Sequence, residues 1–215
     1  MKSPEETKAI LVPVDFTEIT SNAINHAVEL AKLFNKPIQL LHIVSKGLFE
    51  SETKIEVEEE EALAKLANLA EEIFASTGIE TASMVRRGNI YDTIGEIAKE
   101  LPATLAVMGT HGVKGIQKIV GSNAIRVIYS AGEVPFFVVQ QRPVPEDGYK
   151  KVVLPFSFTA ESRQKLAWAI HLNKIFKCKF HLLIETENDE FIAQKLKNNQ
   201  VFAEKYLKQH DCNYE

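Results

Sequence analysis

The feature that most constrains the fold is a regular alternation of short apolar runs with amphipathic stretches. Five runs are typical of strands in a parallel sheet: residues 8–14, 38–44, 81–86, 104–108 and 134–139. The third run, residues 81–86, shows only a weak apolar–polar alternation. Apolar residues at helical spacing predict helices within residues 23–34, 55–77, 90–101 and 122–129. This alternation predicts an α/β fold with a parallel sheet and helices on both faces. With the first strand at the centre, we expect a Rossmann-like open five-stranded sheet in the order 3-2-1-4-5.

The opening pattern of the chain returns after residue 150. Residues 8–17 read KAILVPVDFT, and residues 150–159 read KKVVLPFSFT, with the two copies held at one constant offset. A match of this length without a gap indicates an internal duplication, of which the second copy supplies only strand, helix, strand and helix. We therefore expect a first domain over residues 1–142, a linker over 143–149 and a partial second repeat over 150–215. On this interpretation the chain is a shortened form of a longer tandem protein.

Composition and charge narrow the class of protein. Hydrophobic residues make up 45% of the chain and charged residues 25%, which predicts a globular protein rather than a disordered one. A net charge of −4 argues against a general nucleic-acid binder, which needs a basic patch. We see neither a signal peptide nor an apolar stretch long enough to span a membrane, and the two cysteines have no metal-ligand spacing. We expect a cytoplasmic protein that binds neither nucleic acid nor membrane.

Two unusual loops follow the strands at the centre of the predicted sheet. In an open parallel sheet, ligands bind beyond the carboxyl ends of the strands, where the strand order reverses. The first strand ends in Pro13-Val14-Asp15, and the fourth leads through Met108 and Gly109 into a glycine-rich loop. We expect both loops to border the same ligand site.

The glycine-rich loop ends in Gly121-Ser122-Asn123, which is predicted to open a helix. A helix N-terminus presents unpaired N–H groups and partial positive charge, which suit a phosphate. An alternative is that Ser122 or Asn123 only caps the helix. The loop matches neither the Gly-Lys-Ser/Thr phosphate loop nor the dinucleotide motif.

Together these motifs resemble the universal stress protein family. The resemblance rests on the residues that end the first and fourth predicted strands and on three further motifs. These are Arg87-Gly88-Asn89, Gly121-Ser122-Asn123 and Val134-Pro135 before the last strand. It covers residues 8–140 fully and residues 150–215 in part. It implies a stress-response regulatory protein that binds an adenine nucleotide, ATP first among them. A Mg²⁺ or Mn²⁺ ion would be held through the phosphates.

The resemblance also assigns roles to individual positions. Asp15 and the backbone at Val44 would meet the adenine end, and Gly109 would approach the ribose. The phosphates would be held by Gly112, Gly121, Ser122 and Asn123. Pro13, Met108 and His111 complete the nucleotide-binding set, although His111 also suits a solvent-facing turn. The family further implies pairing through strand 134–139, either in a homodimer or between the two repeats.

Two departures from the family pattern keep alternatives open. Eight residues separate Gly112 from Gly121, where the nucleotide-binding branch of the family has nine. This spacing favours a nucleotide-independent dimerisation or interaction module. In the second copy, Ser157 replaces Asp15, so that half should not bind nucleotide in the same way. A weak phosphohydrolase is a further alternative, but Asp15 has no partner acid, base or nucleophile in the sequence, so we expect no enzyme.

Two aromatic side chains on predicted helices are assigned by pattern alone. His26 is expected at the surface of the first helix. Trp168, which stands among aliphatic residues in the second copy, is expected in the core.

Overall fold

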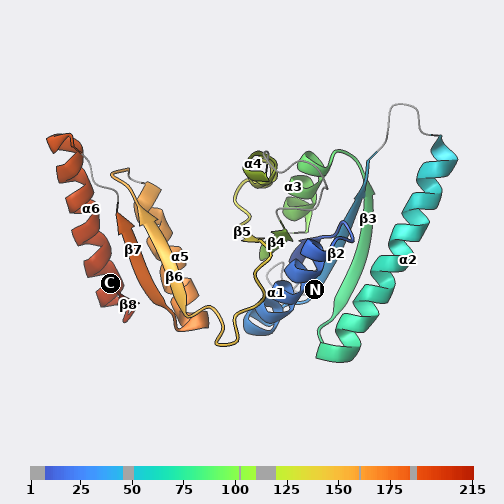
Figure 1. Cartoon of the computed structure of the whole chain (residues 1–215), viewed down its shortest axis with the longest axis horizontal. Coiled ribbons are helices and arrows are strands. Elements are labelled where there is room, and N and C mark those ends of the chain that lie inside the picture. The colour runs from blue at the N-terminus through green and yellow to red at the C-terminus, as the bar shows by residue number, and fades with distance from the viewer. Residues whose placement is uncertain (1–7, 46–50, 102, 110–119, 160, 185–187) are drawn as a thin grey trace, which may run out of the picture. The chain divides into compact units, whose positions relative to one another are not determined.

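A computed structural model describes residues 8–45, 51–101, 103–109, 120–159, 161–184 and 188–215, and for residues 120–123 and 161 only the backbone. The chain divides into two compact units, Met1–Val144 and Pro145–Glu215, which we call unit 1 and unit 2. Figure 1 shows the elements of both units. Each unit is described by itself below.

Unit 1 is a five-stranded parallel sheet with helices on both faces. Its strands are β1 (Ile10–Pro13), β2 (Ile38–Val44), β3 (Thr81–Arg87), β4 (Leu105–Gly109) and β5 (Phe136–Val139). Its helices are α1 (Glu18–Phe34), α2 (Glu52–Thr77), α3 (Ile90–Glu100) and α4 (Val120–Ala131). The strand order is β3-β2-β1-β4-β5, with every pair parallel, which confirms the predicted topology.

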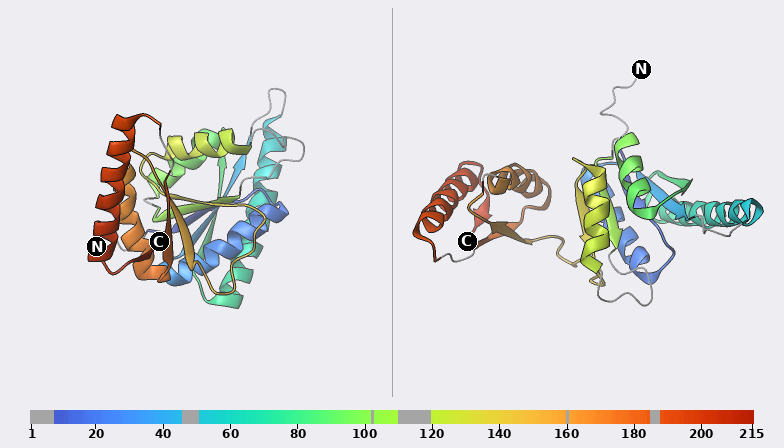
Figure 2. Two further views of the ribbon diagram at one scale, coloured as in Figure 1. Left: turned by 60° about the vertical axis from the view of Figure 1, so that its left-hand side comes forward. Right: turned by 90° about the horizontal axis from the view of Figure 1, so that it is seen from above.

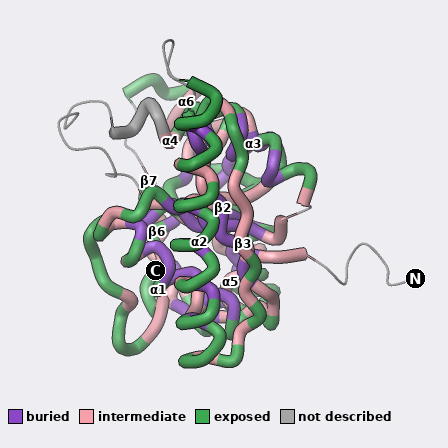
Figure 3. The backbone as a smooth tube through the Cα atoms, turned by 90° about the vertical axis from the view of Figure 1, so that its right-hand side faces the viewer, coloured by how far each residue is buried: buried purple, intermediate pink, exposed green. Residues whose placement is uncertain are grey.

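Helices α3 and α4 cover one face of the sheet. They pack as a pair on the side chains of Leu11, Leu41, Ala106 and Met108. The alternate strand residues, such as Val12 and Leu40, are fully buried on the opposite face, where α1 and α2 contact the sheet. Burial on both faces explains why the central strands read as continuous apolar runs (Figure 3).

Local sequence signals set where the helices begin and end. Thr17 caps α1 by accepting a hydrogen bond from the N–H of Thr20, and Gly78 ends α2 in the left-handed conformation at φ 72°. Helix α2 begins at Glu52 rather than at residue 55, because Ser51 supplies an N-cap before the apolar pattern becomes regular. Strand β5 begins at Phe136 rather than at residue 134, since Pro135 has no N–H for the ladder.

Unit 2 is a three-stranded parallel sheet with two helices. Its elements are β6 (Lys151–Phe156), α5 (Glu161–Phe176), β7 (Lys179–Ile184), α6 (Glu190–Gln209) and β8 (Asn213–Tyr214). The sheet order is β6-β7-β8, and α5 and α6 pack against each other and against this sheet (Figure 2). Leu154, Phe156 and Phe180 are buried, whereas Val153 and Leu183 on the other face are more than half exposed. Among the described residues of both units, no helix has the length and apolar character needed to cross a bilayer.

Candidate functional site

The strand order reverses between β1 and β4, and the pairing of these two strands is short. Their Cα register covers only Ile10 with Leu105 and Leu11 with Ala106. Strand β1 then stays with β2, as Pro13 pairs with Leu41 and the Val14 N–H donates to the Leu41 carbonyl at 2.8 Å. Strand β4 stays with β5 as far as Gly109. The carboxyl ends of β1 and β4 therefore part where a ligand site is expected in this topology.

Asp15 follows β1 and is held by hydroxyl groups of the next turn. Its Oδ1 accepts hydrogen bonds from the Thr17 N–H at 3.1 Å, from the Thr17 hydroxyl at 2.6 Å and from the Thr20 hydroxyl. Asp15 is nevertheless exposed, and its N–H donates to Thr20 Oγ1 at 3.4 Å. Donors that converge on Oδ1 hold the carboxylate in one orientation, and these hydrogen bonds leave the other oxygen available for a ligand donor.

Thr17 and Thr20 were not among the residues predicted for the site. The signal was present in the spacing Asp15-x-Thr17-x-x-Thr20, since Asp carboxylates and Thr hydroxyls at a strand–helix junction often bond the local backbone.

Phe16 has an unusual backbone conformation beside Asp15. Its φ is 60°, in a region that bulky residues seldom adopt. Its ring lies 4.9 Å from that of His42 on β2, and the Lys65 ammonium on α2 lies 5.7 Å from the ring centre. His42 contacts the Val14 carbonyl through Nδ1 at 2.7 Å. These contacts stabilise the strained loop and leave 42% of the Phe16 surface exposed next to the Asp15 carboxylate.

Three predicted site residues have structural roles within unit 1. Met108 is buried in the core beneath α3 and α4. A Cβ atom added to Gly109 would lie 2.6 Å from Ile19 Cγ2, so glycine is needed here for α1 to approach β4. The Val44 carbonyl accepts from the Gly88 N–H at 3.1 Å, so a ligand donor at this position would share the carbonyl with β3.

Most of the glycine-rich loop lies outside the described residues. His111 and Gly112 belong to that segment. Helix α4 begins at Val120, two residues before the predicted start at Ser122. Gly121, Ser122 and Asn123 therefore belong to its first turn, where backbone N–H groups have no partner within the helix.

Arg87 supplies positive charge at the carboxyl end of β3, but it is engaged by α2. Its guanidinium donates to Glu59 at 2.6 and 2.7 Å and also to Glu52. The hydrogen bond from Arg87 lowers the pKa of Glu59, and the same bonds raise the pKa of Arg87. The charge of Arg87 thus holds the end of β3 to α2.

His26 lies in the interior, which corrects the surface assignment made from the helical pattern. Only 5% of its surface is exposed, and Nε2 contacts the Arg142 carbonyl at 2.9 Å. Asn22, one turn earlier on α1, donates to the carbonyls of Gln140 and Arg142, each at 2.7 Å. Helix α1 therefore binds the segment that follows β5, a contact that periodicity on one helix does not reveal.

A family model described as the universal stress protein family matches residues 6–140. The chain belongs to this family. A universal stress protein of Methanocaldococcus jannaschii is 32% identical over 145 residues, which are 62% of this chain and 82% of that relative.

Solved universal stress proteins share the fold. One from Archaeoglobus fulgidus aligns with a TM-score of 0.72 at 18% identity over 96% of this chain and 74% of that chain. A universal stress protein in complex with cAMP aligns with a TM-score of 0.51 at 19% identity, over 63% of this chain and 98% of that chain. At these identities the likeness concerns the fold alone.

Proposed function

We propose that unit 1 of this universal stress protein is a regulatory domain that binds an adenine nucleotide, with ATP as the first candidate. The site lies beyond the carboxyl ends of β1 and β4. The observation that carries the proposal is the Asp15 carboxylate, held by Thr17 and Thr20 at the point where the two strands part. A fixed carboxylate at a topological switch point suits the ribose hydroxyls or the amino group of adenine.

The phosphates would lie at the start of α4. Gly121, Ser122 and Asn123 belong to its first turn, which supplies backbone N–H groups and the positive end of the helix dipole. His111 and Gly112 complete the proposed set with Pro13, Val44, Met108 and Gly109. Mg²⁺ or Mn²⁺, bound through phosphate oxygens, would offset the charge of a triphosphate. Within the described part of the chain, no group of three or more His, Cys, Asp or Glu side chains is placed to hold a metal ion.

Membership of the family supports the binding of an adenine nucleotide, and the choice of ATP among these nucleotides is our proposal. The solved family member in complex with cAMP carries an adenine nucleotide on the same fold. Our proposal is regulatory rather than enzymatic, because the described partners of the Asp15 carboxylate are the hydroxyls and N–H of its own loop. The Thr17 hydroxyl also caps α1, so we assign these contacts a positioning role rather than a catalytic one.

We also propose that unit 2 is a partial second repeat without this site. Ser157 replaces Asp15, and its Oγ lies 3.1 Å from the Thr159 hydroxyl and 2.7 Å from that of Ser162. The loop keeps the hydrogen-bonding pattern of unit 1 but has no carboxylate. It therefore has no charged acceptor for a ribose or an adenine amino group.

The edge of β5 is a proposed pairing surface, either between two copies of the chain or between repeats. Among the described strands, β5 pairs only with β4, so its other edge presents main-chain groups for a partner strand. Light scattering would report a dimer for the first arrangement. Val138→Lys, at a side chain that is 40% exposed, should then shift the mass toward the monomer.

Calorimetric titration of ATP with MgCl₂ into the full chain tests the nucleotide proposal. We expect saturable binding near one site per chain, lost in both Asp15→Ala and Gly121→Val. Ser157→Ala is the matched control, because it changes the corresponding loop in unit 2 and should leave binding unchanged.

Two other outcomes would redirect the proposal. No heat with ATP, ADP, AMP or cAMP would favour a nucleotide-independent interaction module, as the eight-residue glycine spacing suggests. Steady ATP turnover that Asp15→Ala abolishes would favour a phosphohydrolase.

A further inference from the structure

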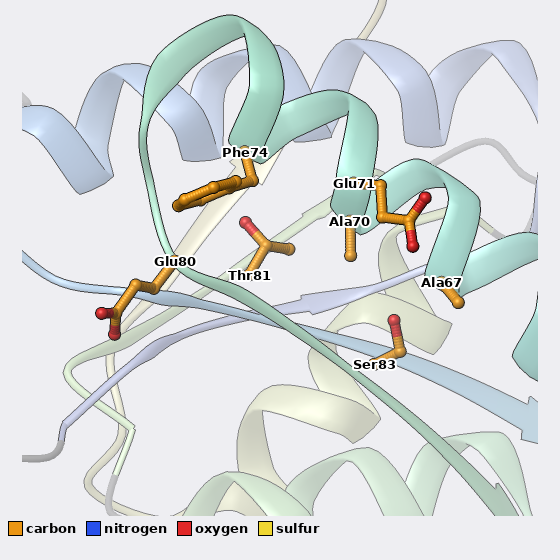
Figure 4. A pocket seen from close by; sticks show the side chains of 7 residues that line it. All are labelled: Ala67, Ala70, Glu71, Phe74, Glu80, Thr81 and Ser83. Carbon is orange, nitrogen blue, oxygen red and sulfur yellow. The ribbon is translucent and has the colours of Figure 1, made fainter.

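A cavity of about 430 Å³ lies between the second half of α2 and the first half of β3, away from the candidate nucleotide site. Figure 4 shows the side chains that line it. The helix contributes Ala67, Ala70, Glu71 and Phe74, and the strand side contributes Glu80, Thr81 and Ser83. The volume is in the range of cavities that hold a side chain or a small molecule.

The strand that forms one wall of this cavity is an edge of the sheet. Among the described strands, β3 pairs only with β2. The Ile38 N–H of β2 donates to the Glu80 carbonyl at 2.9 Å, and the Gly88 N–H donates to the Val44 carbonyl. Even-numbered residues of β3 thus direct their main-chain groups toward β2. The N–H and C=O groups of Thr81 and Ser83 consequently point to the open edge.

The same two residues direct their side chains toward α2 and into the cavity (Figure 4). A strand added to this edge would place every second side chain on the α2 side of the sheet, beside Thr81 and Ser83. The cavity is therefore positioned to accept a side chain from an added strand.

The lining defines the chemistry of that side chain. The exposed Glu71 carboxylate on α2 borders the cavity and favours a cation, whereas the Glu80 side chain points away from the cavity (Figure 4). Phe74 keeps 56% of its surface exposed and offers a ring face to an alkyl stem or a cationic head. Ser83 Oγ is buried, and within the described residues it has no hydrogen-bond partner, so one polar group at the cavity is unsatisfied.

We propose that the β3 edge binds an extended peptide segment of a partner protein, with one lysine or arginine side chain in the α2–β3 cavity. Main-chain hydrogen bonds to Thr81 and Ser83 supply strand addition. The stem of the basic residue packs on Ala67, Ala70 and Phe74, and its charge lies beside Glu71. This function is separate from nucleotide binding, and the two fail or succeed independently.

Selection from a displayed library of random seven-residue peptides on the full chain tests the proposal. We expect the enriched peptides to share one lysine or arginine flanked by β-branched or aromatic residues. Binding of a synthetic enriched peptide should weaken about fivefold or more in the Glu71→Gln variant. Replacing its basic residue with norleucine should have a similar effect.

Two variants separate this site from general electrostatic attraction. Glu72→Gln removes the same charge from an exposed neighbour outside the cavity and should leave the affinity within about twofold. Thr81→Pro removes one edge donor at the first residue of the strand, where proline is tolerated, and should weaken binding while circular dichroism stays unchanged.

Several results would overturn the proposal. They are enrichment of peptides without a basic residue, equal binding of the enriched peptide to the Glu71→Gln variant, or no effect of Thr81→Pro. A dimer of the chain that Thr81→Pro dissociates would also overturn it, since it would assign this edge to a second copy.

Discussion

The first half of unit 1 and the whole of unit 2 share a local structure but differ in what covers their sheets. In unit 1, Leu11 pairs with Gln39 and Pro13 with Leu41. In unit 2, Val153 pairs with His181 and Pro155 with Leu183, which is the same register at one constant offset. The helix between the strands ends similarly in both, with Asn35 at φ 51° and Lys177 at φ 47°.

The burial of matched residues differs sharply. Leu11 and Leu41 have no exposed surface, because α3 and α4 pack on them. Their counterparts Val153 and Leu183 are 59% and 58% exposed, and the described part of unit 2 has no helix on that face. The comparison teaches that strand pairing and helix capping are set locally. Burial of a strand residue depends instead on elements that follow much later in the chain.

The largest difference in stability between the two units is expected when the matched residues Leu41 and Leu183 are each replaced by alanine. Leu41→Ala should lower the free energy of unfolding of unit 1 by about 3 kcal/mol, since it leaves a cavity in a packed core. Leu183→Ala should change that of unit 2 by less than about 0.5 kcal/mol. Hydrogen exchange of the amides in each unit measures both effects, and Trp168, the one tryptophan of the chain, reports on unit 2 by fluorescence. Equal losses in the two units would break the comparison.

A second test concerns the close contact between Gly109 of β4 and Ile19 of α1. The described part of unit 2 has no such contact. Gly109→Ala places a Cβ 2.6 Å from Ile19 Cγ2 and should destabilise unit 1 by about 1–3 kcal/mol. Adding Ile19→Ala should recover part of the loss, because it removes the atom that clashes. Urea titration of both variants and of Ile19→Ala alone gives the coupling energy. A coupling near zero would show that Gly109 is not required by this contact.

A third test exchanges the residues that distinguish the two strand–helix loops. Asp15→Ser should lower the stability of unit 1 by about 1 kcal/mol, because a charged acceptor of three hydrogen bonds becomes a neutral one. The same change should abolish nucleotide binding. Ser157→Asp should give unit 2 a carboxylate without giving it a nucleotide site. Calorimetric titration measures binding, and a gain of a second site in Ser157→Asp would contradict the assignment of the other contacts to unit 1.

The smallest effect concerns one exposed ion pair in each unit. Hydrogen bonding to Arg87 lowers the pKa of Glu59 in unit 1, and hydrogen bonding to Lys179 lowers that of Glu215 in unit 2. A folded-state pKa below the unfolded value contributes stability above the unfolded pKa. That contribution is lost as the pH falls through the folded pKa.

Carbon-13 titration of the glutamate carboxyls checks this prediction. Arg87→Met should raise the pKa of Glu59 toward the ordinary value of a glutamate. Lys179→Met should raise the pKa of Glu215 part of the way, because His181 also contacts this carboxylate. An unchanged pKa in either variant would remove that pair as the cause of the shift.

The sequence by itself determined the order of elements in unit 1, the 3-2-1-4-5 sheet and the repeat pattern of unit 2. These depend on contacts between residues a few positions apart, on short crossovers and on the position of proline and glycine. The sequence also indicated Asp15 and Gly109 as site residues, because Asp15 follows β1 and Gly109 ends β4, and these strands are neighbours. It did not identify Thr17 and Thr20 as the partners of Asp15, since side-chain hydrogen bonds leave little periodic signal.

Only the tertiary structure decided which apolar and aromatic side chains are covered. His26 is buried because residues after β5 return to α1, whereas Trp168, at the matching position of α5, keeps 47% of its surface exposed. The pattern on each helix had suggested the opposite for both. The sequence of a helix shows which of its faces is apolar, but the element that covers that face comes from a distant part of the chain. Burial at these positions is therefore a property of the assembled sheet rather than of the local sequence.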